Sequence, residues 1–518
     1  MKINFKLTGL ALFTLLLSSC SKELDTKPVV ELSFENLLQQ DPSAAKGLLS
    51  KIYGTFALSG SNGPGSSDIS APDAGESAFL RNLVNLEDFT TDDIKNRWGD
   101  NGLDQLTTSS NWNGDNKFFK YLFDRIYYTI PQSTNLIIAL NSTSNPDKAL
   151  YISELRFLRS LSYYYLIDCF GKGVLVTTEN YGSTEPLPEA SRTDIFNYVE
   201  SELLAVENDL PLTNEYGRAN KTVCRMLLAK LYLNAEVYTG TARYNDALTY
   251  VNKVINEGGY SLAPNYIQNF SGDNNTSPEI IFPLIADALV SQSYGNTTYL
   301  VNGDLNSETM PLAQFGSNAG WGGHRATKAW YGLFGATATD LASSSDIRAS
   351  LFWTTGHTYE MTDYKTWTNG YPSTKFRNTN FVGTSVPTGF SSTDFPLFRL
   401  SDAYLMYAEC ALRGATGGSN SQALTYVNQV RTRAGAATIG AADLTLDFIL
   451  DERARELNLE GQRRTDLIRF GKFTGGTYLW PWKGGVLNGT SIPDTYKLFP
   501  LPSSALSSNP NLTQNPGY

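Results

Sequence analysis

Residues 218–255 carry the pattern that decides the fold, and they read RANKTVCRMLLAKLYLNAEVYTGTARYNDALTYVNKVI. Apolar and small side chains recur at four-residue steps from Val223 to Ala235, and the period resumes after Gly240 and continues to Ile255. A period of about 3.6 residues places such side chains on one face of a helix. The stretch therefore predicts two helices that fold back on each other as an antiparallel hairpin.

Three further helix pairs are predicted on the same grounds. They join residues 155–165 to 195–210, 403–411 to 424–430 and, more loosely, 46–58 to 118–140. Small residues at the helix crossings and the Tyr244-x-x-Ala247 opening resemble tetratricopeptide units. Because such hairpins cannot bury both faces alone, neighbouring pairs must stack. We therefore predict a mainly α-helical fold, a tetratricopeptide-like scaffold of about four helix pairs.

The N-terminus has the pattern of a lipoprotein signal peptide. Lys2 and Lys6 precede an apolar stretch, residues 7–17, and Leu17-Ser18-Ser19-Cys20 resembles the bacterial lipobox. The apolar stretch has about half of the roughly 20 residues that a membrane-spanning helix needs. We predict that residues 1–19 are removed and that Cys20 carries a lipid anchor. Ordinary secretion with a free cysteine is the alternative.

After the signal peptide we predict a single domain over residues 20–518. Helical repeats are expected at about 44–257 and 399–434, followed by a C-terminal segment at 435–518. Residues from about 258 to 395 are rich in Gly, Asn, Ser, Thr and aromatic residues with little helical period, so they predict a large loop-rich subdomain. Loops on a rigid scaffold are the usual place for ligand contacts.

Composition excludes several classes of function. The chain has 51 acidic and 41 basic residues and a net charge of −10, which argues against a nucleic-acid partner. The two histidines, His324 and His357, do not have the spacing of metal ligands, so we predict no cofactor and leave a structural calcium ion undecided. Three cysteines in apolar helical patterns are predicted to be buried thiols, with one disulfide as the alternative: Cys169, Cys224 and Cys410.

Two stretches near the C-terminus identify a family. Residues 395–405 read FPLFRLSDAYL, and residues 449–457, ILDERAREL, lead into residues 459–471, LEGQRRTDLIRFG. Both resemble motifs of the SusD/RagB-type nutrient-binding lipoproteins. With the lipobox, the helix pairs and the FPLP at residues 499–502, the resemblance covers essentially the whole chain.

The resemblance implies more than the fold. WPWKGG at residues 480–485 and NGTS at residues 488–491 look most like the starch-binding founding member of the family. Membership implies a lipid-anchored protein on the surface of an outer membrane, which covers a TonB-dependent importer as a lid.

Three acidic residues raise the question of catalysis. Glu452, Glu456 and Glu460 follow one another at four-residue steps and are expected on one helix face, where a pair of acids could hydrolyse a glycoside. Four arginines expected on the same helix favour an ion-pair network instead: Arg453, Arg455, Arg463 and Arg464. We therefore predict that the protein is not an enzyme, because neighbouring cations hold such acids ionised.

The candidate site combines aromatic and polar side chains in loops. A pyranose ring has an apolar face that stacks on aromatic rings and hydroxyl groups that need hydrogen bonds. Trp98, Tyr294 and Trp321 lie among Gly, Asn and Ser residues rather than in a core period. At matched positions the resemblance implies that these three rings stack on an α-glucan, while Arg81 and Asn101 contact its hydroxyl groups.

Each of these residues also has a structural interpretation. The tryptophans could plug loops into the scaffold, and Arg81 could pair with Glu76 or Glu87. Three residues depart from the starch-binding pattern and are expected to alter the rim of the site: Arg97, His324 and Arg325.

The leading hypothesis is capture of starch or maltooligosaccharides. The alternatives are another glycan, such as a β-glucan or a host oligosaccharide, and a repeat-protein adaptor that binds protein or peptide.

Overall fold

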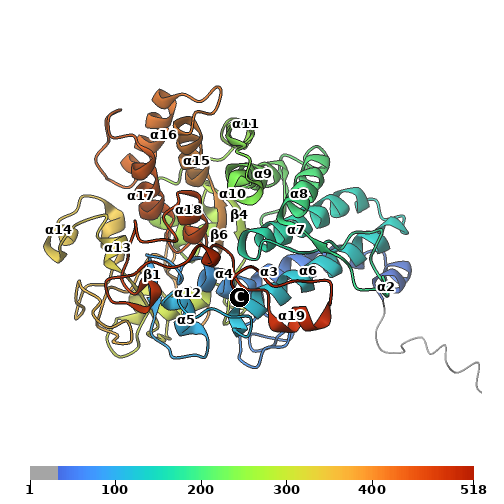
Figure 1. Ribbon diagram of the computed structural model, residues 1–518, viewed down its shortest axis with the longest axis horizontal. Coiled ribbons are helices and arrows are strands. Elements are labelled where there is room, and N and C mark those ends of the chain that lie inside the picture. The colour runs from blue at the N-terminus through green and yellow to red at the C-terminus, as the bar shows by residue number, and fades with distance from the viewer. Residues whose placement is uncertain (1–32) are drawn as a thin grey trace, which may run out of the picture.

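The computed structural model of the protein describes residues 33–518. Figure 1 shows helices packed side by side over the right and upper parts of the molecule, while the yellow segment at the lower left consists mainly of loops and short helices. The prediction of a mainly helical, tetratricopeptide-like fold is confirmed. Cys20 and the signal peptide lie outside the described residues.

The scaffold is a continuous stack of helices. Its members are α3 (Ala44–Ala57), α6 (Lys117–Asn141), α7 (Lys148–Cys169), α8 (Arg192–Val206), α9 (Lys221–Leu233), α11 (Tyr244–Glu257), α15 (Leu400–Leu412) and α16 (Asn420–Arg433). Helix α6 packs on α7 and α7 on α8, while α9 packs on α11, α11 on α15 and α15 on α16. The predicted helix pairs are therefore present, and they bury their apolar faces against one another.

The helix predicted over residues 218–238 is interrupted. Helix α9 ends at Leu233, and a short helix α10 (Ala235–Thr239) follows. The Asn234 carboxamide donates to the Lys230 carbonyl, and such local hydrogen bonds compete with the helical ones. Gly240 then ends α10 with a φ of 77°, a conformation that favours glycine.

Smaller helices complete the chain. They are α2 (Phe34–Gln40), α4 (Phe79–Glu87), α5 (Leu103–Thr107), α12 (Thr297–Asp304), α13 (Lys328–Tyr331), α14 (Ala338–Ala342), α17 (Leu446–Leu457), α18 (Arg463–Arg469) and α19 (Ser503–Ser508). In the part of the chain that the structure describes, no helix is both long enough and apolar enough to span a membrane.

Within residues 33–518 three antiparallel strand pairs form, and two of them connect distant parts of the chain. Strand β1 (Ile94–Asn96) pairs with β5 (His324–Ala326), β2 (Gly173–Val174) pairs with β3 (Glu189–Ala190), and β4 (Ile280–Leu284) pairs with β6 (Phe395–Arg399). The first pair joins the N-terminal part of the scaffold to the loop-rich segment, and it determines where the candidate site forms.

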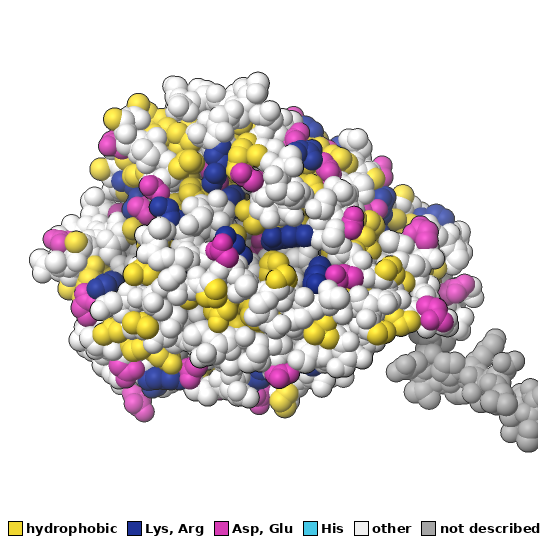
Figure 2. Space-filling view, viewed as in Figure 1, with side chains coloured by type: hydrophobic (Ala, Val, Ile, Leu, Met, Phe, Trp, Pro, Cys, Tyr) yellow, Lys and Arg dark blue, Asp and Glu magenta, His cyan; other side chains and the backbone are white. Residues whose placement is uncertain are grey.

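Acidic and basic side chains are interspersed on the face shown in Figure 2. That face has no continuous basic field such as a nucleic acid needs. Inside the molecule, the three predicted buried thiols are unpaired and buried, as expected for Cys169, Cys224 and Cys410.

A buried ion network surrounds α17. Glu452 contacts Arg348 at 2.9 Å and Arg431 at 2.6 Å, and it also contacts Arg455 at 2.8 Å. Glu456 lies 2.6 Å from an Arg399 nitrogen. These carboxylates are fully buried, so their charges are stabilised by the cations and not by water.

Two details of the predicted network were wrong. Glu460 does not share the helix face, because α17 ends at Leu457 and Leu459 turns the chain with a φ of 67°. Glu460 instead meets Lys375 at 2.6 Å and Arg399 at 2.7 Å. Four arginines were predicted to pair with Glu452, Glu456 and Glu460. Among the described residues, Arg455 is the one of the four that does so, through Glu452. The other three bind different acids: Arg453 binds Asp402 and Asp466, Arg463 binds Asp92, and Arg464 binds Glu87.

We predict that Glu452→Gln destabilises the protein by about 3 kcal/mol or more at neutral pH, because it leaves buried arginines without a counter-charge. Burial alone would raise the pKa of Glu452, but Arg348, Arg455 and Arg431 outweigh it and lower the pKa to about 2. Because the pKa of Glu452 is lower in the folded protein, its ionised carboxylate stabilises the folded state at pH values above its pKa in the unfolded chain, about 4.5. This stabilisation is lost as the pH falls through the pKa of the folded state.

Urea unfolding of the unsubstituted protein and the Glu452→Gln variant at about pH 7 and about pH 3 measures the effect. The difference in unfolding free energy between the two proteins should be smaller at about pH 3. The control is Glu360→Gln, which removes an exposed pair with Lys328 and should cost less than about 1 kcal/mol. Equal stability of the Glu452 variant and the unsubstituted protein at neutral pH would contradict the prediction.

Candidate functional site

The pairing of β1 with β5 places Trp98 beside Trp321. Asn96 lies opposite His324 in the strand register, and the backbone of Arg97 donates to the Gly323 carbonyl at 3.0 Å. The Trp98 indole nitrogen then donates to the Trp321 carbonyl at 3.2 Å. The two indole centroids are 6.3 Å apart, with an angle of 53° between their planes.

Tyr294 extends this pair into a row of three rings. Its centroid lies 6.3 Å from that of Trp321, with an angle of 49° between the planes. All three side chains are partly exposed. The structure therefore brings together the three predicted aromatic residues and turns each ring relative to the next, so that they form an arc. We call Trp98, Trp321 and Tyr294 the aromatic arc.

Helix α12 supports two members of the aromatic arc. It begins just after Tyr294, where the Asn296 side chain caps it by accepting from the Thr298 backbone. Near its other end, the Asn302 carbonyl accepts from the Trp321 backbone at 2.6 Å. One short buried helix thus fixes both Tyr294 and Trp321.

The indole of Trp98 packs closely against Gly323, His324 and Tyr299. A Cβ atom on Gly323 would lie 2.4 Å from the indole ring, so glycine is required there for the backbone to approach it. The His324 ring centroid lies 5.2 Å from that of Trp98, and Tyr299 lies 5.9 Å away. A Cβ on Gly303 would in turn lie 2.2 Å from the His324 ring. The position of Trp98 is therefore fixed from behind.

The prediction that His324 and Arg325 alter the rim was wrong. Both are buried, because their strand is covered by neighbouring segments on both sides. His324 Nδ1 lies 3.2 Å from Asp304 Oδ1 under Trp98. Burial, together with nearby Arg81 and Arg325, lowers the pKa of His324, and burial raises the pKa of Asp304. The Arg325 guanidinium donates to the Gly323 and Thr366 carbonyls.

Arg81 makes one of the two ion pairs considered for it. It is on α4, where its guanidinium lies 3.6 Å from Glu76 and 4.6 Å from the ring centroid of Tyr299. The alternative of a pair with Glu76 is therefore present. Yet the Arg81 side chain remains 10% exposed, and its Nε has no protein acceptor among the described residues. That Nε atom is itself buried, beside Tyr299, which contacts Trp98.

Asn101 is exposed in the loop between β1 and α5. It lines a cavity of about 240 Å³ with Lys117, whose ammonium group lies 2.8 Å from Glu76. Glu76 therefore links the surroundings of Asn101 to Arg81. No direct contact joins Asn101 to Arg81.

The C-terminal motif positions the loop that carries Trp98. Arg463 binds Asp92 through two nitrogens, at 2.8 and 2.7 Å. The backbone of Leu459 donates to Asp93, and that of Gly461 donates to Asp88. These contacts hold the segment between α4 and β1, and β1 leads directly to Trp98.

Sequence reasoning missed Phe390. Its ring lies 5.0 Å from that of Tyr294, and it is partly exposed. The signal was present, because Gly389-Phe390-Ser391 places an aromatic residue between small residues, as at Tyr294 and Trp321.

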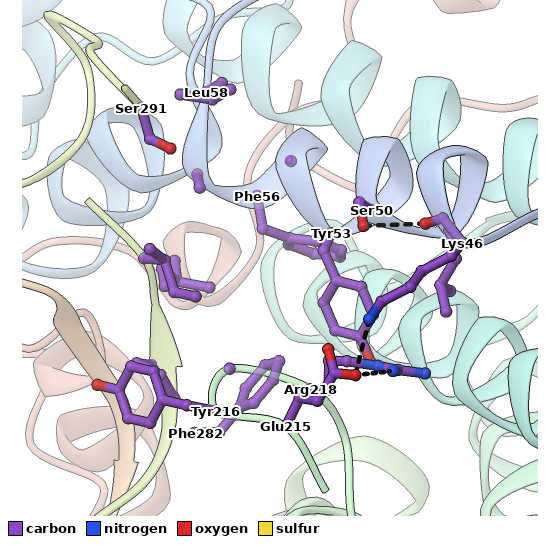
Figure 3. A pocket seen from close by; sticks show the side chains of 17 residues that line it. Lys46, Ser50, Tyr53, Phe56, Leu58, Glu215, Tyr216, Arg218, Phe282 and Ser291 are labelled. Atoms are coloured by element: carbon purple, nitrogen blue, oxygen red, sulfur yellow. Dashed lines mark hydrogen bonds and ion pairs between the residues drawn. The ribbon is translucent and has the colours of Figure 1, made fainter. Parts of the chain in front are cut away.

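A separate cavity of about 340 Å³ lies between α3, residues 215–218 and β4 (Figure 3). Its interior is mostly apolar, and an ion pair of Lys46 with Glu215 lies at its rim. The hydroxyl groups of Tyr53 and Tyr216 already donate to Glu154 and Asp394. The cavity thus offers few free groups for a sugar, and the aromatic arc is the better candidate.

A helical scaffold thus presents an arc of rings with polar groups nearby, an arrangement that suits the binding of a saccharide. The profile of the SusD family matches residues 351–518. The starch-binding protein SusD of Bacteroides thetaiotaomicron is 32% identical, over 97% of this chain and 96% of its own. The chain belongs to the SusD family.

Solved structures show the same fold at lower identity. A SusD superfamily protein from Parabacteroides distasonis has a TM-score of 0.72 and 22% identity, and the match covers 92% of this chain and 99% of that one. Surface glycan-binding protein A from Bacteroides thetaiotaomicron, in complex with laminarihexaose, has a TM-score of 0.67 and 19% identity, over 91% and 99% of the two chains.

We predict that Gly323→Ala destabilises the protein by about 1–3 kcal/mol, because the added methyl group overlaps the Trp98 indole. In a Trp98→Ala background the same change should cost much less, since the methyl group then has space. Urea unfolding of the two single variants and the double variant measures this coupling. The control is Gly47→Ala, where an added Cβ meets no atom within 4 Å. If the losses of unfolding free energy in the two single variants simply add up in the double variant, Gly323 and Trp98 are not coupled and the prediction is wrong.

Proposed function

We propose that the protein captures starch and maltooligosaccharides on the aromatic arc. The observation that carries this proposal is the arrangement of three partly exposed rings, each turned by about 50° from its neighbour. An α-glucan coils, so the apolar faces of its successive sugar rings also turn. The 32% identity to a starch-binding relative supports the same ligand.

A β-glucan is the second candidate. A solved structure of the same fold holds laminarihexaose, although it is only 19% identical to this chain. Laminarihexaose is therefore the natural competitor in any binding experiment.

We propose that the protein binds the glycan without cutting it. Hydrolysis needs one acid that is kept protonated and one that reaches the substrate. Glu452 and Glu456 are buried, and the arginines around them lower their pKa values despite their burial. Neither acid meets these requirements. No cofactor or metal ion forms part of the proposal.

We predict that Trp321→Ala weakens maltoheptaose binding by roughly thirty-fold, because removal of a central aromatic contact costs about 2 kcal/mol. A shallow saccharide site binds at about 10⁻⁴ M, so the dissociation constant should enter the millimolar range. Isothermal titration calorimetry with maltoheptaose and laminarihexaose measures both ligands. Tyr181→Ala, which removes an exposed ring elsewhere, is the control.

Unchanged affinity in folded Trp321→Ala protein would show that the sugar binds elsewhere. Tighter binding of laminarihexaose by the unsubstituted protein would favour the β-glucan. The sugar recovered after titration should be intact, and shorter products would overturn the proposal that the protein does not cut its ligand.

We further propose that Cys20 carries the lipid anchor, which holds the protein on the outer face of the outer membrane. There it would deliver glycan to a TonB-dependent importer. The lipobox and membership of the SusD family support this proposal.

We predict that Cys20→Ala abolishes lipid attachment, because the thiol that accepts the lipid is lost. Membrane fractionation and surface labelling of cells that express either protein should then find the variant released from the outer membrane. Ser21→Ala, which leaves the lipobox cysteine in place, is the control. Retention of the Cys20 variant in the outer membrane would contradict the prediction.

A further inference from the structure

We propose that Phe390 forms a fourth stacking platform next to the aromatic arc, with the Asn318 carboxamide as its hydrogen-bonding partner, so that the site binds longer glucans than three rings can cover. The inference rests on the proposed glucan binding and extends it by one subsite.

The first argument is the continuity of the rings. Phe390 lies 5.0 Å from Tyr294 with an angle of 46° between the planes, close to the 49° between Tyr294 and Trp321. The centroid distance is shorter than the 6.3 Å between Tyr294 and Trp321. Successive ring contacts thus run from Trp98 through Trp321 and Tyr294 to Phe390.

The second argument is that Phe390 does not pack against the hydrophobic core. Trp98 and Trp321 also pack against the hydrophobic core, whereas Tyr294 and Phe390 are not among the described side chains that do so. Phe390 is therefore a surface ring next to the arc, and it can stack on a ligand without leaving the core.

The third argument is that the backbone of Phe390 is fixed before any ligand binds. The Gly389 carbonyl accepts from Asn302 at 2.9 Å, and the Ser391 backbone donates to Thr298 at 3.0 Å. Both partners belong to α12, the helix that also supports Tyr294 and Trp321. The fourth ring is therefore held by the same element as two rings of the arc, and little order has to be gained on binding.

Asn318 supplies the polar partner. Its side chain is exposed, and its Oδ1 atom lies 3.4 Å from the place that a Cβ on Gly389 would take. Its backbone donates to the Thr388 carbonyl at 3.1 Å, which holds the carboxamide near Phe390. An aromatic face beside an amide is the combination that binds the face and the edge of a pyranose.

A chain-length series tests the subsite. The two indoles have larger faces than a phenyl ring, so a short oligosaccharide should occupy them first, whereas a long one should also reach Phe390. Phe390→Ala should weaken maltoheptaose binding about fivefold and leave maltotriose binding within about twofold. Asn318→Ala should show the same length dependence with a smaller loss, and Phe390→Trp should preserve binding.

Calorimetry with both sugars, together with circular dichroism to confirm folding, gives the answer. Phe381→Ala is the matched control, because it removes the same side chain from an exposed position of the same loop. If the unsubstituted protein prefers laminari-oligosaccharides, the short and long members of that series replace the maltooligosaccharides.

Two results would overturn the subsite alone. One is unchanged maltoheptaose affinity in Phe390→Ala while Trp321→Ala binds weakly. The other is an equal loss for short and long sugars, which would mean that the substitution disturbs the whole arc. Absence of binding of any glucan by the unsubstituted protein would instead overturn the proposed function, and the subsite with it.

Discussion

The buried carboxylates of α17 and of the turn after it are the constraint on which the rest of the structure depends. A buried charge is tolerated only beside an opposite charge, so each acid dictates where a cation must lie. Glu456 requires both Arg348 from the loop-rich segment and Arg399 from β6. Glu460 requires Lys375 from the same loop-rich segment. Loops that lack the periodic apolar contacts of the helices are therefore joined to the scaffold by charge.

The same segment controls the site at a distance. Arg463, three residues after Glu460 in the motif, binds Asp92, which precedes β1. Strand β1 leads to Trp98, which packs against Gly323 and His324. This stretch, which resembles the family's motif, thus positions the loop that carries Trp98. Under the proposed function, a loop held in this way needs little further ordering when a sugar binds.

The sequence predicts what depends on a local period and misses what depends on distant partners. The helix pairs were predictable because apolar residues repeat within each helix, as from Val223 to Leu231. The three rings of the arc were predictable because each lies among small residues in a loop. The partners of Glu456 were not predictable in this way, since Arg348 is more than 100 residues away in the sequence. His324 was expected at the rim because sequence does not reveal that its strand is covered on both faces.

Under the proposed function, the geometry of the rings matters more than the polar groups for which glycan fits. Hydroxyl contacts largely replace contacts with water and contribute little net affinity, so Arg81 and Asn101 would mainly orient the sugar. The rings come from separate loops before α12, β5 and β6 and after β1. Buried groups behind the rings hold them in place, among them Asn302 and His324. Under the proposed function, a row of such modest contacts suits a protein that must also release its ligand, because many copies on one surface hold a long glucan while each contact breaks easily.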